Sequence, residues 1–202
     1  MKSGQQQIVS VIIVVGLVLA AVATVLPWAT SVIQKKKDTK SLDDVYNFFQ
    51  TLDETIRDIA KNGGEESLRL NVPGRMTITP ESFSSVSNNS ITFNFRSKVS
   101  NVAEGGWIPL NTPNANETAT LGIDPPGVIF GKAEKTGNEI DVWYKLWYRK
   151  LKDPSSNQTY KIAINTTYND EKSTTTGFLR IQRLGSETIG GNLIITKIKI
   201  IV

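Results

Sequence analysis

The chain has 202 residues, of which 39% are hydrophobic and 21% are charged, and its formal net charge is +4. It contains no cysteine and no histidine. These absences exclude disulfide bonds, thiol catalysis, cysteine-based zinc sites and every mechanism that needs a histidine base or ligand. The mean hydropathy of −0.18 resembles that of a water-soluble protein, but it averages two very different regions.

The first region is an uncharged block between Lys2 and Lys35. Its segment from Ile8 to Trp28 is apolar on every face and, at about 1.5 Å per residue, is long enough as a helix to cross a hydrocarbon core of roughly 30 Å. Pro27 is expected to kink or locally break this helix near its end, because it removes one backbone donor. The lysines at 35–37 suit the headgroup level of a membrane.

Three interpretations of this segment remain open. A small residue at Ala21 and another at Ala23 fit the cleavage site of a secretory signal. The length of the segment fits a single-pass membrane anchor equally well. The third interpretation depends on the residues that precede the apolar block.

These residues are Met1-Lys2-Ser3-Gly4, followed by three glutamines and the hydrophobic helix. This pattern resembles the class III signal peptides of archaeal type IV pilin-like proteins. The resemblance implies that a prepilin peptidase cuts between Gly4 and Gln5, and that the helix remains as membrane anchor and filament core. The helix residues to which it assigns that role are Ile8, Val11, Val15, Gly16, Leu19, Ala20 and Pro27. Val9 occupies a position where many members carry an acid, which favours a minor subunit or an anchored relative.

The second pattern is an amphipathic helix in which apolar residues recur at spacings of three and four. Its stripe consists of Leu42, Val45, Tyr46, Phe49, Leu52, Ile56, Ile59 and Ala60. Ser41 offers an N-cap, and Asn62 with two glycines offers a stop. The opposite face, which carries Asp53 and Arg57 among other charged residues, is expected to be solvated. The sequence leaves open whether residues 34–41 join the two helices.

From Leu68 onward the hydrophobic period changes to two. Strands are predicted at 68–72, 75–79, 90–96, 118–123, 127–131, 139–150, 159–168, 177–184 and 192–201. With no further helix, the fold class is α+β: a long N-terminal hydrophobic and amphipathic helix followed by an antiparallel β-sheet or β-sandwich head domain. The last strand is so apolar that we expect it inside the sheet.

One face of the strand 139–150 carries Trp143, Lys145 and Trp147, which we interpret as a candidate surface contact. Aromatic faces beside a cation suit a carbohydrate or a partner protein. Alternatively, a loop or the amphipathic helix covers both tryptophans. Trp107 lies in the segment 105–116, which is predicted to be a long loop, and is expected to plug the core.

Four Asn-x-Ser/Thr sequons, at Asn88, Asn116, Asn157 and Asn165, are candidate glycosylation sites if the head is extracellular. The three lysines that follow the apolar block would instead place the head in the cytoplasm by the positive-inside rule. The Ser-, Thr- and Asn-rich strands are typical of surface domains. We therefore expect a membrane-anchored protein or an extracellular filament at the cell surface, with the head outside.

These patterns divide the chain into a leader (1–4), a transmembrane or filament-core helix (5–36), an amphipathic extension (37–64) and an extracellular β-rich head (65–202). The expected function is that of a structural subunit, a major or minor pilin, of an archaeal type IV pilus-like surface filament, with adhesion as a role of the head. The alternative is a membrane-anchored extracellular binding or stator-like module that does not polymerise. Expected partners are identical or related pilin subunits, membrane lipid before assembly and the prepilin peptidase. We expect no enzymatic activity, no cofactor, no metal and no nucleic acid, because the basic residues are scattered over the strands.

Overall fold

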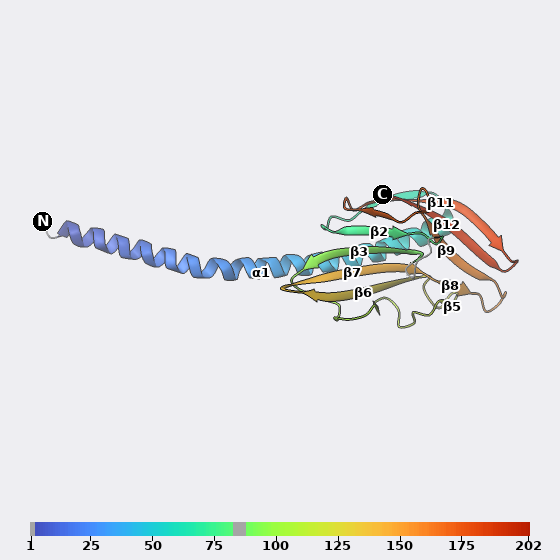
Figure 1. Ribbon diagram of the computed structural model, residues 1–202, viewed down its shortest axis with the longest axis horizontal. Helices are drawn as coiled ribbons and strands as arrows, with labels where there is room; N and C mark the ends of the chain where they lie inside the picture. The colour runs from blue at the N-terminus through green and yellow to red at the C-terminus, as the bar shows by residue number, and fades with distance from the viewer. Residues whose placement is uncertain (1–2, 83–87) are drawn as a thin grey trace.

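A computed structural model describes the backbone of residues 3–82 and 88–202, and the side chains of residues 11–82 and 88–202. Within these ranges the chain forms one long helix, α1 (Ser3–Asn62), and twelve strands. The helix projects from a β-rich head, and only its second half is enclosed by the strands (Figure 1). This layout confirms the predicted α+β class.

The helix α1 is continuous, so the two predicted helices are one. Pro27 lies inside it without ending it, and the helix axis only curves gently before it reaches the head (Figure 1). The predicted break at Pro27 is therefore wrong. Ser41 is not an N-cap, because its hydroxyl donates to the Lys37 carbonyl one turn earlier. The predicted stop is confirmed: Gly63, at a φ of 82°, donates its N–H to the Ile59 carbonyl.

The twelve strands form two six-stranded sheets. The strands are β1 (Glu65–Arg69), β2 (Arg75–Thr79), β3 (Ser90–Ser97), β4 (Ile108–Pro109), β5 (Thr118–Thr120), β6 (Gly127–Thr136), β7 (Glu139–Tyr148), β8 (Lys150–Lys152), β9 (Thr159–Asn165), β10 (Lys172–Thr174), β11 (Phe178–Ile189) and β12 (Leu193–Ile201). One sheet has the order β1-β11-β12-β9-β8-β5, and the other has the order β10-β2-β3-β7-β6-β4. The pairs β12–β9 and β5–β8 are parallel, so the first sheet is mixed. In the second sheet every pair of these strands is antiparallel, as predicted.

The first strand begins earlier than predicted and ends at Arg69. Leu70 and Val72 are still buried, but they belong to the turn that follows. The N–H of Leu70 donates to the Gly177 carbonyl at 2.8 Å. A side chain at Gly177, which has a φ of 65°, would collide with the Leu70 carbonyl, so this close approach requires glycine. The predicted strand 139–150 is wrong at its end, because β7 stops at Tyr148 and Lys150 begins β8 in the other sheet. The short strands β4 and β10 show no period in the sequence, because they have only two or three residues.

The core lies where the second half of α1 packs on the inner faces of both sheets. The predicted stripe is confirmed, since its residues are buried or packed against the core. Phe49 is completely buried, and its ring centroid lies 6.1 Å from that of Tyr144 on β7. The apolar strand β12 lies between β11 and β9, as expected, with Ile198 and Ile200 buried.

The two sheets are tied together by Asn89, a buried residue just before β3. Its side-chain amide donates to the carbonyls of Tyr148 at 3.0 Å and Ile162 at 2.8 Å, and its Oδ1 accepts the N–H of Ile164 at 2.8 Å. Tyr148 belongs to one sheet and the two isoleucines to the other. One side chain thus satisfies backbone groups of both sheets at their junction.

Candidate functional site

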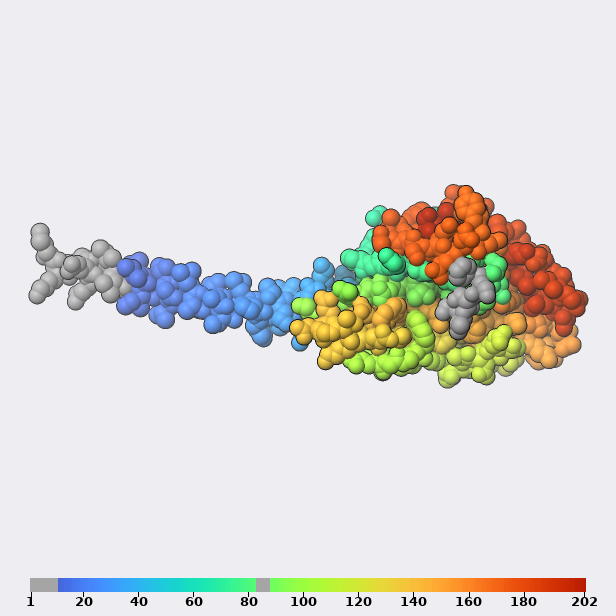
Figure 2. All heavy atoms as spheres, viewed as in Figure 1, coloured from blue at the N-terminus to red at the C-terminus, as the bar shows by residue number. Residues whose placement is uncertain are grey.

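The most unusual surface of the protein is the first half of α1, which we call the apolar rod (residues 11–33). Most of its large side chains are exposed, from 46% for Val22 to 69% for Trp28, and Val32 next to the head is half-buried. No other described part of the chain packs on its outer end (Figure 2). Among the described residues, α1 is the one helix that is long and apolar enough to cross a membrane.

Most residues assigned to the membrane or filament core lie on this rod. Val11, Val15 and Leu19 are 62%, 51% and 64% exposed, and Gly16, Ala20 and Pro27 are exposed as well. A side chain added at Gly16 would meet nothing within 4 Å. The side chains of Ile8, Gly4 and Gln5 lie outside the described residues, so the predicted cleavage site stays a prediction.

The rod has few polar groups, and the hydroxyl groups of its threonines are bonded to backbone carbonyls of the same helix. The Thr24 hydroxyl donates to the carbonyls of Ala20 and Ala21, and the Thr30 hydroxyl donates to those of Leu26 and Pro27. A hydroxyl bonded within its own helix does not require water. The rod is therefore suited to a lipid environment or to a bundle of similar helices.

The rod joins the head at Asp38, which is buried. Its Oδ2 accepts the backbone N–H of Lys98, just after β3, at 2.7 Å, and its Oδ1 accepts the Gln34 amide at 2.6 Å. The lysines at 35–37 are exposed immediately before it. A buried carboxylate thus fixes the helix to the head directly after the apolar rod and the three exposed lysines that follow it.

A second buried carboxylate, Asp53, fixes the helix deeper in the head, although its position on the polar face predicted that it would be solvated. The Tyr148 hydroxyl donates to its Oδ1 at 3.0 Å, and Arg57 Nε pairs with its Oδ2 at 3.0 Å. A side chain at Gly127 would collide with Asp53, so glycine there permits the approach. Burial raises the pKa of Asp53 above its ordinary value, although Arg57 and Tyr148 oppose the shift. Burial also raises the pKa of Tyr148.

The face of β7 that was predicted to form a surface contact points away from α1. Tyr144, Leu146 and Tyr148 face the helix and are fully buried, whereas Trp143, Lys145 and Trp147 are half-buried on the opposite side. The helix therefore does not cover the tryptophans. The neighbouring strand β6 supplies Phe130 and Lys132, which pair with Lys145 and Trp143 in the antiparallel register.

This outer face alternates aromatic rings with cations. Lys145 Nζ lies 4.4 Å from the ring centroid of Trp107 and 5.0 Å from that of Phe130. Lys132 Nζ lies 5.3 Å from the Trp143 centroid. Trp107 is 37% exposed and covers Lys145, so the expectation that it plugs the core is wrong.

The four sequons differ in accessibility. Asn116 and Asn157 are exposed in loops, and Asn157 has a φ of 53°. Asn88 and Asn165 are half-buried, and the Asn88 amide donates to the Glu81 carbonyl at 3.4 Å. If the chain is glycosylated, Asn116 and Asn157 have the space for a glycan.

Sequence reasoning missed Phe130 and Lys132, although a signal was present. Gly137-Asn138 stands between two strand patterns, and a two-residue loop of this type predicts a β-hairpin with a fixed register. That register alone places Phe130 opposite Lys145. No comparable local signal identifies Asp38 or Asp53, because their partners are far away in sequence.

Comparison with known proteins gives one match. A model described as a family of unknown function (DUF7289) matches residues 4–94. The match covers just under half of the chain and includes α1, β1, β2 and most of β3. The part of the chain that resembles this family thus contains the rod and Asp38, whereas Lys98, to which Asp38 is bonded, lies just outside it. No curated protein and no solved structure matches the chain.

Proposed function

We propose that the protein is a structural subunit, a major or minor pilin, of an archaeal type IV pilus-like surface filament. The observation that carries the proposal is the division of one continuous helix into an exposed apolar rod and a half that is packed in the head. A rod that no part of its own chain covers needs an apolar environment from other molecules. Lipid before assembly and identical or related subunits after assembly both supply one.

The mechanism is one of packing rather than catalysis. The rod is stored in the bilayer and then transferred into a bundle of similar rods. The transfer exchanges one apolar environment for another, so it needs little rearrangement of polar groups. The buried contacts of Asp38 and Asp53 transmit the position of the rod to the head, which faces outward and carries the exposed sequons.

Processing is part of the proposal. A prepilin peptidase would cut between Gly4 and Gln5 on the cytoplasmic side and leave the rod on the mature chain. Mass spectrometry of the amino terminus, with the protein purified from its native membrane, tests this step. A mature chain that starts at Gln5 supports the proposal, whereas one that starts at Thr24 means a secreted protein and contradicts it.

Assembly is the second test. Electron microscopy of cells that express the chain with its peptidase should show fibres that are labelled by an antibody to the head. Leu19→Asp places a charge in the rod and should abolish the fibres, whereas Glu54→Gln, on the exposed side of the packed half, should leave them intact.

A membrane-anchored module that does not polymerise is the second candidate. It is favoured by Val9, which stands where many pilin-like proteins carry an acid. This candidate predicts an intact amino terminus at Met1 and discrete particles instead of fibres. Both candidates place the head at the cell surface.

A further inference from the structure

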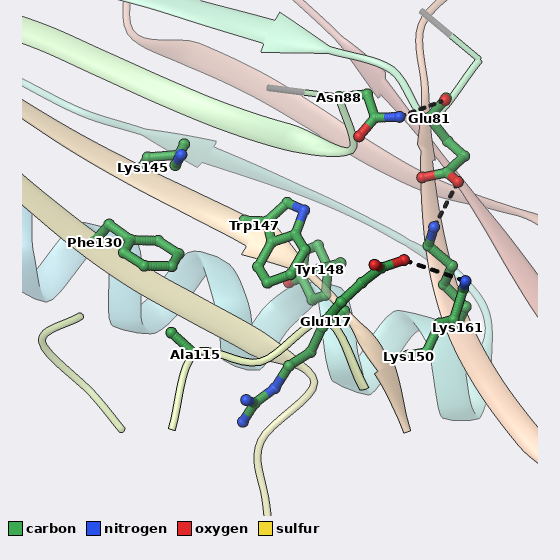
Figure 3. Close-up of a pocket in the computed structure, with 11 residues that line it drawn as sticks. Glu81, Asn88, Ala115, Glu117, Phe130, Lys145, Trp147, Tyr148, Lys150 and Lys161 are labelled. Carbon is green, nitrogen blue, oxygen red and sulfur yellow. Dashed lines mark hydrogen bonds and ion pairs between the residues drawn. The ribbon is translucent and has the colours of Figure 1, made fainter. Parts of the chain in front are cut away.

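The head contains an open cavity of about 670 Å³ where β7 leaves one sheet and β8 enters the other (Figure 3). It lies on the outer face of the sheet, away from α1. The aromatic side chains Phe130 and Trp147 form one side of it, and Lys145, Lys150, Lys161 and Glu117 lie around them. The cavity belongs to the head alone, so its role does not depend on assembly of the rod.

The cations of the cavity are not equivalent. Lys150 Nζ lies 3.3 Å from a carboxylate oxygen of Glu117, and Lys161 pairs with Glu81. Lys145 has no ion pair within the described part of the chain, and residues 83–87 contain no charged side chain. Burial lowers the pKa of the Lys145 ammonium, and no neighbouring carboxylate opposes this shift. A half-buried cation without a counter-ion favours an anionic ligand.

The aromatic rings beside Lys145 provide flat apolar surface. The ring centroids of Phe130 and Trp147 lie 6.3 Å apart at an interplanar angle of 50°, and both side chains are half-buried. Such faces pack well against the C–H face of a sugar ring. The side chain of Glu117 is 73% exposed at the rim, where it can accept hydrogen bonds from hydroxyl groups.

These features together select one class of ligand. A bare phosphate would meet Lys145 but would leave the aromatic rings uncovered. A neutral sugar would cover the rings and leave Lys145 without a counter-ion. A sugar that carries a carboxylate satisfies the cation, the aromatic surface and the acceptors at once.

We propose that this cavity binds an acidic glycan, with the carboxylate of a uronic acid residue on the Lys145 ammonium and the sugar face on Trp147. Trp143, which sequence reasoning grouped with these residues, lies outside the cavity beneath Lys132. Because the cavity is open, a polysaccharide chain can extend beyond it in both directions. The head would then attach to acidic polysaccharide.

The probe for the test is tetragalacturonate, and the full-length chain is held in a detergent that has no sugar headgroup. Isothermal titration should give a Kd in about the millimolar range or tighter, weakened by added salt. The fully methyl-esterified tetrasaccharide, which keeps the rings and loses the charges, should bind at least about tenfold more weakly. Tetraglutamate, which keeps the carboxylates and lacks the sugar rings, should also bind at least about tenfold more weakly than tetragalacturonate.

The decisive variant is Lys145→Gln, which should weaken tetragalacturonate binding by about tenfold or more and leave binding of the esterified form unchanged. Lys132→Gln is the matched control, because Lys132 lies on the same face but outside the cavity and already pairs with Glu134. It should change neither Kd. Trp147→Ala should weaken binding of both tetrasaccharides, with circular dichroism to confirm that β7 is intact.

Three results would overturn the proposal. They are no heat of binding with tetragalacturonate at millimolar concentration, equal affinity for tetraglutamate, or an unchanged Kd in Lys145→Gln. Each is distinct from failure of the filament proposal, which concerns the amino terminus and fibre formation only.

Discussion

The two halves of α1 are both rich in apolar residues, yet one half is exposed and the other is buried. Leu17 in the rod is 66% exposed, whereas Leu52 in the packed half is completely buried. The difference lies in the pattern. The packed half has an apolar stripe that its own head can cover, whereas the rod is apolar all round and offers no polar side to solvent. Apolar content alone therefore does not determine burial, because an all-round apolar helix needs neighbours on every side.

Truncating a large side chain in each half gives the largest expected contrast. Phe49→Ala removes a fully buried ring that packs on Tyr144 and should lower the free energy of unfolding of the head by about 3–5 kcal/mol. Leu19→Ala in the rod should change it by less than about 0.5 kcal/mol. Urea unfolding followed by near-ultraviolet circular dichroism measures both. A similar loss in the two variants would mean that the rod is part of the folded core.

A substitution at Asp38, where the rod joins the head, should have a smaller effect on the unfolding free energy. Asp38→Ala leaves the Lys98 N–H without its carboxylate acceptor, and because this contact is only partly buried the loss should cost about 0.5–1.5 kcal/mol. Asp43→Ala, a nearby exposed acid on the same helix, is the matched control and should be nearly neutral. Hydrogen exchange of the Lys98 amide reports the joint directly, and it should become faster in Asp38→Ala only. Unchanged exchange would show that the carboxylate does not hold the helix to the head.

These two halves also show how far the sequence leads. The stripe from Leu42 to Ala60 could be predicted, because the contacts that define an amphipathic helix repeat every three or four residues. The polar contacts could not, because Asp38 meets Lys98 and Asp53 meets Tyr148 across 60 and 95 residues of sequence. An acid on the outer side of a helical wheel looks solvated until its distant partner is known.

In the head, too, local structure could be predicted but contacts between distant parts of the sequence could not. The period of two identified most strands, and the strand β2 was predicted with its observed bounds. The parallel pairing of β12 with β9 joins strands that are separated by β10 and β11, and no local pattern encodes it. The outer face of β7 could be predicted as aromatic and cationic. The cavity could not, because Lys150 and Lys161 reach it from the other sheet.

The third prediction concerns pH and the deeper attachment of the helix. The pKa of Asp53 is raised above its ordinary value of 3.8, so the folded head binds this proton more tightly than the unfolded chain does. The stabilisation is fully present below pH 3.8 and is lost as the pH rises through the folded-state pKa. Asp53→Asn removes this titration and keeps an acceptor for Tyr148.

The measurement is the difference in unfolding free energy between the original chain and Asp53→Asn as a function of pH. The original chain should gain stability relative to the variant as the pH falls towards 3.8. Asp58→Asn, an exposed acid on the same helix, serves as the control and should show no such gain. A difference that is flat with pH, or one that favours the variant in acid, would contradict the raised pKa.

Deletion of the whole rod should change the unfolding free energy of the head less than Phe49→Ala or Asp38→Ala does. Removal of residues 1–33 deletes the whole rod but keeps Gln34, which donates to Asp38. The new helix end leaves its first N–H groups without partners, but water satisfies them. The unfolding free energy should therefore change by less than about 0.5 kcal/mol, while the protein becomes monomeric without detergent. Sedimentation in detergent-free buffer together with urea unfolding tests both statements. A truncated head that aggregates would show that the rod protects an apolar surface of the head, and the two halves of α1 would then not be independent.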